Sequence, residues 1–299
     1  YMEEVYGIPP YTVGRYFSND EIAAFERGEG GYNYLDGTFR DVAVEQMHEL
    51  SVSGSSEKTQ FLVSASFNMD NGIVRNSDGK RANYRAKIDT ELRSWWKVGA
   101  TLWGYYSEKK GPSFGQNLNV LNRALMFPRF LSAKDEEGSY NDLSREPNPM
   151  RKVNEVKSDG YSYTSYFQAY SDFTILKGLT FRTAISLNLG NKNNQSANTK
   201  DSYQAHPSQA GYTSASVSNE NSFGMLNTNT LSYIKEFNEN HRINATLVYE
   251  QSYGTTYKNG ITVRNLFDDD IAYNNLALAQ STETPSSDRT KTTMMSALA

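Results

Sequence analysis

The 299-residue chain contains no cysteine and only three histidines, His48, His206 and His241. Without cysteine, neither disulfide bonds nor thiolate metal sites can form, and three scattered histidines are too few for a zinc or iron centre. The net charge is only −4. That balance argues against a nucleic-acid partner held by neutralisation of phosphates. The composition therefore points away from redox, metal-centred and nucleic-acid-binding functions.

Long apolar runs are also missing. No stretch approaches the roughly 18 consecutive apolar residues of a membrane helix, and the mean hydropathy is −0.67. Neither fact excludes strands that cross a membrane, because a transmembrane strand needs only about 9–11 residues with every second one apolar. Half of the side chains in such a strand are polar, so mean hydropathy hardly detects it.

What the chain does contain is a repeated alternation of period two. From Tyr84 to Leu92 the even positions are apolar or neutral, whereas the odd positions are Arg85, Lys87, Asp89 and Glu91. Residues 61–69 alternate in the same way. Successive side chains of a strand point to opposite faces, so this pattern predicts strands with one apolar and one polar face. The 21 tyrosines suit a sheet that has one face in contact with water.

The connections between predicted strands alternate between short and long. We expect strands at about 44–53, 59–70, 82–92, 98–107, 161–175, 179–189, 220–234, 242–253 and from 290 onward. Short turns fall at 54–58, 93–97, 176–178 and 235–241, and long loops at 71–81, 108–160, 190–219 and 254–289. Outer-membrane barrels have short periplasmic turns and long extracellular loops. The sequence thus predicts an all-β fold, an antiparallel transmembrane β-barrel segment.

The barrel interpretation also predicts the roles of the first 43 residues and of two tryptophans. Residues 1–43 are expected to form an extracellular loop with a short helix near 18–25, and residues 44–299 a partial barrel. Trp95 and Trp96, in a short turn, are candidates for the aromatic girdle at a membrane interface. The alternative is that these two tryptophans cap the core of a soluble protein.

Several segments resemble the SusC/RagA family of TonB-dependent outer-membrane transporters of Bacteroidetes. They are the residues 18–24, 49–58 (ELSVSGSSEK), 72–78, 95–99 (WWKVG), 142–149 and 175–182 (ILKGLTFR). The resemblance implies a barrel of about 22 strands, an N-terminal plug, energy supplied through TonB, a SusD-like lipoprotein partner and import of glycans or peptides. Measured against that pattern, the plug, the TonB-contact segment and the last strands are absent. We therefore expect about nine strands of a larger bacterial outer-membrane barrel.

Two groups of side chains are candidate contacts. Loop tyrosines can stack on sugar rings and bond to hydroxyl groups; they are Tyr140, Tyr161, Tyr163, Tyr203, Tyr212 and Tyr273. Charged residues on the polar strand face are expected to line the lumen or to contact the plug; they are Arg85, Lys87, Asp89, Glu91 and Arg182. Loop packing is the alternative role for each tyrosine.

No other pattern indicates chemistry. Asp268-Asp269-Asp270 lacks the spacing of a calcium loop, so a solvated acidic loop is favoured there and at Glu136-Glu137. The chain has no motif of a hydrolase, phosphate-binding loop or metalloprotease, so neither an enzyme nor a cofactor is expected. The alternatives to an importer are a non-transporting surface protein, such as an adhesin or secretion barrel, and a soluble sugar-binding β-sandwich.

Overall fold

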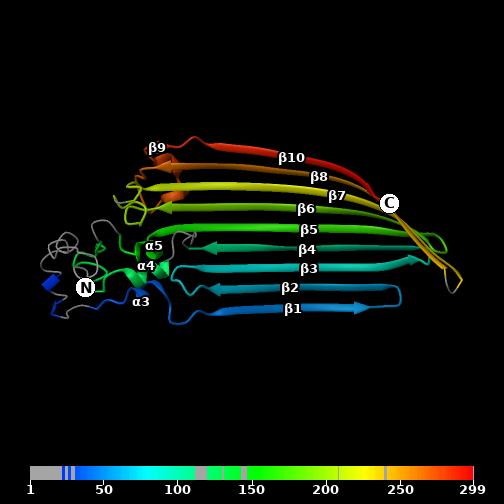
Figure 1. Cartoon of the computed structure of the whole chain (residues 1–299), viewed down its shortest axis with the longest axis horizontal. Helices are drawn as coiled ribbons and strands as arrows, with labels where there is room; N and C mark the ends of the chain where they lie inside the picture. The colour runs from blue at the N-terminus through cyan, green and yellow to red at the C-terminus, as the bar shows by residue number, and fades with distance from the viewer. Residues whose placement is uncertain are drawn as a thin grey trace, which may run out of the picture.

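The computed structural model describes residues 22–23, 26–27, 31–111, 120–129, 131–142, 147–207, 209–238 and 241–298. Within these residues, ten strands form one antiparallel sheet in the order β1-β2-β3-β4-β5-β6-β7-β8-β10, and the short β9 pairs with β8. The long strands follow one another across the sheet as a continuous meander (Figure 1).

All nine predicted strands are present. They are β1 (Glu45–Ser55), β2 (Thr59–Asn71), β3 (Asp78–Arg93), β4 (Trp96–Lys110), β5 (Val156–Leu176), β6 (Leu179–Asn198), β7 (Ser214–Asn238), β8 (His241–Arg264) and β10 (Ser286–Leu298). The two-residue β9 (Ser281–Thr282) was not predicted. The short connections lie at one end of the sheet and the long ones at the other, as the alternation predicted (Figure 1).

The predicted boundaries of the loops 190–219 and 254–289 were wrong, because β6, β7 and β8 extend well into them. Over residues 190–196 of β6 polar side chains occupy both faces, so the alternation that marks a half-apolar strand is missing there. Amide side chains hold neighbouring strands together instead. Asn191 Nδ2 donates to Asn221 Oδ1 at 2.6 Å, and Asn193 Nδ2 donates to Asn219 Oδ1 at 2.6 Å.

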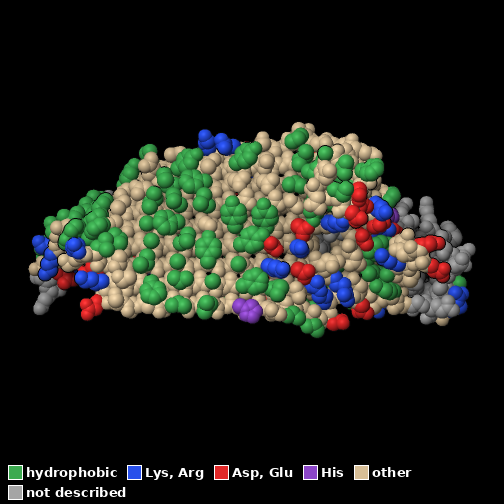
Figure 2. Space-filling model, turned by 180° about the vertical axis from the view of Figure 1, so that it is seen from behind, with side chains coloured by type: hydrophobic (Ala, Val, Ile, Leu, Met, Phe, Trp, Pro, Cys, Tyr) green, Lys and Arg blue, Asp and Glu red, His purple; other side chains and the backbone are tan. Residues whose placement is uncertain are grey.

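The sheet has one apolar face, and that face is exposed. Leu50, Val52 and Leu247 have exposed fractions of 72%, 55% and 55%. Figure 2 shows this face with hydrophobic side chains spread over its middle and many of the charged ones gathered toward its ends. A soluble sandwich buries such a face against a second sheet, and the described strands all belong to one sheet. The sandwich alternative is therefore wrong.

Aromatic side chains mark the two borders of the apolar face. Near the turn end, the rings of Trp95, Trp96 and Phe173 stack, with centroids 5.9–6.4 Å apart. Toward the loop end, the rings of Tyr106 and Tyr161 stack at 6.3 Å. Tyr106 follows Trp96 by ten positions on β4. At about 3.3 Å per residue and a tilt near 40°, that distance spans about 25 Å across a membrane, the height of the apolar band of outer-membrane barrels.

Short helices pack among the long loops, at the end of the sheet opposite the short turns (Figure 1). They are α3 (Tyr34–Thr38), α4 (Val120–Met126), α5 (Arg151–Asn154) and the 3₁₀ turns η2 (Ala272–Asn274) and η3 (Leu276–Leu278). Of the helix predicted near 18–25, Ile22 and Ala23 are helical, and the rest lies outside the described residues. Two small buried cores, one around Tyr34 and Phe127 and one around Ala197 and Val263, hold these loops together.

Candidate ligand-binding face and outer loops

The polar face of the sheet carries the charged residues singled out from the sequence. Directly opposed residues of neighbouring strands share a face, and one such row runs Glu91–Lys97–Asp172–Arg182. Arg85, Lys87 and Asp89 alternate along β3 with the same parity as Glu91 and point to the same face. The structure thus gathers all five predicted residues on one face. Contact with a plug stays a prediction.

Near the turn end, most of these charges neutralise one another. Arg182 donates to both carboxylate oxygens of Asp172, at 2.5 and 2.7 Å, and its guanidinium lies 4.5 Å from the Tyr170 ring centroid. Tyr170 in turn donates to Asp89 Oδ1 at 2.6 Å, and Lys87 Nζ is 2.8 Å from Asp89 Oδ2. Bidentate and charge-assisted bonds of this kind fix side chains, so this part of the face holds itself in place.

Gly99 of β4 makes room for this network. It lies between Asp89 of β3 and Tyr170 of β5 in the register of the sheet. A Cβ atom at this position would overlap the Tyr170 ring and the Asp89 carboxylate. The absence of a side chain therefore lets Tyr170 cross β4 and bond to β3.

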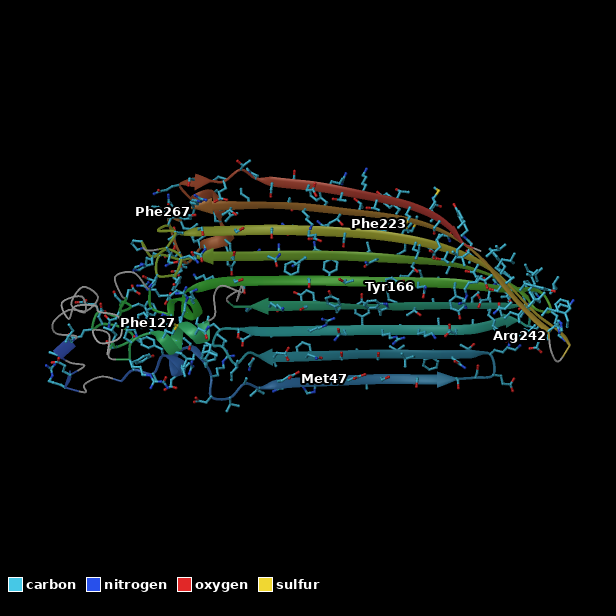
Figure 3. All side chains as sticks on the ribbon, in the orientation of Figure 1. Met47, Phe127, Tyr166, Phe223, Arg242 and Phe267 are labelled. Carbon is cyan, nitrogen blue, oxygen red and sulfur yellow. The ribbon has the colours of Figure 1, made fainter. Side chains whose placement is uncertain are left out.

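Farther toward the loops, the polar face is hollowed by two adjoining depressions of about 520 and 510 Å³, which share Arg81 and Tyr105. We call them together the polar-face groove. Its turn-side half is lined by Arg85, Trp103 and Tyr166, among others, and its loop-side half includes Lys109 and Lys192. Figure 3 places Tyr166 midway along β5, at the centre of the sheet.

Three aromatic rings line the groove: Trp103 is exposed, and Tyr105 and Tyr166 are half-buried. Trp103 is 42% exposed, and its ring lies 5.4 Å from that of Tyr166. The Arg81 guanidinium sits 4.0 Å from the Tyr105 ring centroid. These residues were not predicted as contacts, although one signal for them was present in the sequence. In the alternating pattern of β4, Trp103 and Tyr105 occupy positions that are predicted to point to the polar face, where aromatic side chains are not needed for contact with lipid.

Two of the six candidate tyrosines are buried, which corrects the prediction that they stack on a ligand. Tyr140 is 8% exposed and Tyr203 is 1% exposed. Lys134 and Arg151 lie 4.3 and 4.8 Å from the Tyr140 ring centroid. Burial and the bond to Glu155 raise the pKa of Tyr140. The rings of Tyr140 and Tyr203 pack within the loops, which is the alternative role considered for these tyrosines.

The other four candidates divide into two pairs. Tyr161 and Tyr163 lie on the apolar face, in the aromatic border near the loops, which is the position of a girdle residue. Tyr212 and Tyr273 are half-buried in the outer loops. Arg264 lies 4.5 Å from the Tyr212 ring, and Tyr273 donates a hydrogen bond to Asp159. Burial and that bond raise the pKa of Tyr273 to about 12. The structure does not bring the six tyrosines together.

The three consecutive aspartates anchor a loop to the strands. Asp268 Oδ1 accepts from the Asp270 amide at 2.8 Å, and Asp269 Oδ2 accepts from the Lys200 amide at 2.8 Å. Lys157 Nζ donates to the Asp269 carbonyl at 2.8 Å. Among the described residues, no cluster of three or more acidic or histidine side chains is arranged to hold a metal ion.

A buried ion pair ties two outer loops together. Arg151 Nε and Nη2 donate to the two carboxylate oxygens of Asp142 at 2.9 and 2.7 Å, and Arg151 Nη1 donates to the Asp201 carbonyl at 2.6 Å. Arg151 is only 9% exposed. Because the Arg151 and Asp142 side chains are only 10% and 16% exposed, water screens this ion pair little, and the pair holds the loop segments together.

Lys152, the next residue, is buried without such a partner. Its Nζ atom lies 4.0 Å from the Tyr203 ring centroid and makes no hydrogen bond to any described residue. Burial, together with the nearby Arg123, lowers the pKa of Lys152 to about 8. A cation–π contact supplies part of the lost solvation.

None of the helices in the described part of the chain has the length and apolar character that a membrane-spanning helix requires.

Comparison with known proteins gives one consistent result, although no protein-family model matches the chain. It is similar to two TonB-dependent receptors of Formosa agariphila, at 26% identity over 263 residues (83% of this chain, 25% of the receptor) and 24% over 205 residues (68% and 19%). The chain spans about a quarter or less of these relatives. Both are named as receptors rather than enzymes.

Solved structures agree on the fold. The structure of the RagAB peptide transporter matches with a TM-score of 0.70 at 18% identity, over 90% of this chain and 31% of that one. The RagAB peptide importer in its "closed-closed" state matches with a TM-score of 0.71, over 94% of this chain. The predicted resemblance is thereby confirmed: the chain has the fold of a segment of a TonB-dependent β-barrel of the outer membrane.

Proposed function

We propose that the chain forms part of the wall and outer loops of an importer that takes up nutrient oligomers, glycans or peptides, across the outer membrane. The observation that carries the proposal is the fold itself. One face of the sheet is apolar over about the thickness of a membrane, and the opposite face is polar and contains a groove. The wall of an uptake channel needs both faces, one toward lipid and one toward the passage.

The proposal includes energy and partners. Uptake would be driven through TonB, and a SusD-like lipoprotein would cover the outer loops. The similarity in fold to the RagAB peptide importer supports such a partner. No catalytic step is assigned to these residues, and the protein is proposed to be a transporter rather than an enzyme.

Uptake by intact cells tests the proposal. Cells producing the complete protein would be given labelled oligosaccharide and peptide pools, with and without an intact TonB complex. We expect accumulation in the periplasm that disappears when TonB is removed. Binding at the surface without accumulation would instead identify a non-transporting surface protein. Purification in mild detergent, followed by identification of any co-purifying lipoprotein, tests the partner separately.

A further inference from the structure

Positive charge in the polar-face groove is not balanced as it is at the turn end of the same face. Arg182 and Lys87 each pair with a carboxylate. In contrast, Arg81, Arg85 and Lys109 have no carboxylate within 4.0 Å among the described residues, and all three are exposed. These three cations in the groove therefore lack a carboxylate partner in the described part of the chain, although Arg81 Nε donates a hydrogen bond to the Asn83 amide oxygen at 2.8 Å.

The carboxylate nearest to the loop-side cations is already engaged. Glu220 is the cross-strand partner of Lys192. Its oxygen nevertheless pairs with Lys258 of β8, at 3.3 Å. Lys192 Nζ forms no ion pair or hydrogen bond with any residue that the structure describes, and it remains exposed in the lining. The acidic residue in the lining therefore does little to neutralise the groove.

Rings and cations alternate along the groove. Arg85, Trp103 and Tyr166 lie in one cross-strand row, Tyr105 lies in the next row of this face, and Arg81 in the row after that. Rows of one face are spaced by two residues, or about 7 Å. A ligand lying along the strands would meet Arg85 with two rings at the first step, the Tyr105 ring at the second and the Arg81 guanidinium at the third.

We infer that the polar-face groove binds an oligosaccharide carrying negatively charged groups, either carboxylates or sulfates. Arg81 and Arg85 would bind the charged groups through the paired N–H donors of guanidinium. Trp103, Tyr105 and Tyr166 would stack on sugar rings through their flat apolar faces. The inference rests on the proposed import function and specifies its substrate class. A neutral glycan would leave the guanidinium groups unpaired beside it.

Binding to the complete protein in detergent tests the inference by titration calorimetry. The probes are an oligogalacturonate for carboxylates, a sulfated dextran oligomer, neutral dextran of the same length, and an oligoglutamate as an acidic peptide. We expect at least one charged glycan to bind more tightly than neutral dextran, with affinity falling as salt is added. The R81Q/R85Q variant should lose about tenfold in affinity, and W103L a similar amount.

The matched control is R289Q/K291Q. This variant removes the same two charges from β10, at positions whose parity places them on the apolar face. Equal losses in both double variants would show a non-specific charge effect and overturn the inference, as would unchanged affinity in R81Q/R85Q. Preferred binding of oligoglutamate would overturn the glycan class. TonB-dependent uptake of neutral oligomers by the wild type would leave the import function standing even if these results were negative.

Discussion

At the scale of single residues, Gly99 is a position where the absence of a side chain leaves room for a hydrogen bond between two other strands. Replacement by alanine would place a Cβ atom against Tyr170 and Asp89, so either the ring must move or the bond between them must break. Overpacking of this kind costs about 1–3 kcal/mol. We therefore expect G99A to lower the denaturation midpoint of the complete protein in detergent.

Gly224 is the control for that experiment. It lies on the same face of β7, and a Cβ atom there would make only an ordinary 3.7 Å contact with Asn188. G224A should be neutral or slightly stabilising, because alanine restricts the unfolded chain more than glycine does. Equal destabilisation by both variants would mean that any side chain on this face is harmful, and the specific role of Gly99 would be lost.

The buried amine of Lys152 should make the stability of the folded protein depend on pH. Its pKa is about 8 in the folded protein and near the ordinary 10.5 when unfolded. Between these values the unfolded chain binds more protons, so stability rises with pH over that range. Below pH 8 the full cost of the buried charge is present. We expect K152M to be more stable than the wild type at pH 7.

The same variant should lose its advantage as the pH rises from about 8 to 10.5, because the wild-type amine becomes neutral in the folded state. Denaturation midpoints of both proteins at pH 7, 9 and 10.5 measure this difference. A stability difference that stays constant across that range would show that packing of the methionine, rather than loss of charge, is responsible.

At the scale of strands, the alternation in β6 predicts which side chains touch lipid. Ile185 and Leu187 belong to the apolar face, and Ser186 and Asn188 to the polar one. The chain has no cysteine, so single cysteines can be introduced and spin-labelled one by one. In the complete protein reconstituted in lipid, labels at 185 and 187 should be accessible to oxygen dissolved in the membrane, and labels at 186 and 188 should be much less accessible. Equal accessibility at all four positions would contradict the assignment of faces.

The strands show where sequence reasoning succeeds and where it fails. Between the aromatic borders, lipid on one side and water on the other impose the period-two pattern, so strand positions and faces could be predicted. Beyond the outer border, β6 is polar on both faces over residues 190–196, and the pairing of Asn193 with Asn219 has no such signature. The groove was missed for a related reason, since Trp103 and Tyr166 become neighbours only when β4 and β5 pair in register. Burial of Tyr203 depends on contacts between loops far apart in sequence.

At the scale of the whole molecule, the described sheet has two edges that no described strand covers, the outer sides of β1 and β10. Both strands are long, and their exposed side chains include Leu50 and Met295. Unpaired backbone groups are costly in lipid and promote edge-to-edge association in water. Closure by further strands of a barrel would satisfy both edges.

This geometry predicts how the 299 residues behave when they are produced alone. Refolded from urea into detergent, they should form polydisperse aggregates or remain unfolded, because each exposed edge can pair with another copy and the apolar face finds no closed barrel around it. Size-exclusion chromatography with light scattering measures the association, and urea titration followed by circular dichroism measures cooperativity. The complete protein, treated in the same way, is the control and should refold into a monodisperse species. A monomeric isolated chain that unfolds in one cooperative transition would show that the open sheet is stable without its neighbours, and the barrel-wall assignment would then lose its physical basis.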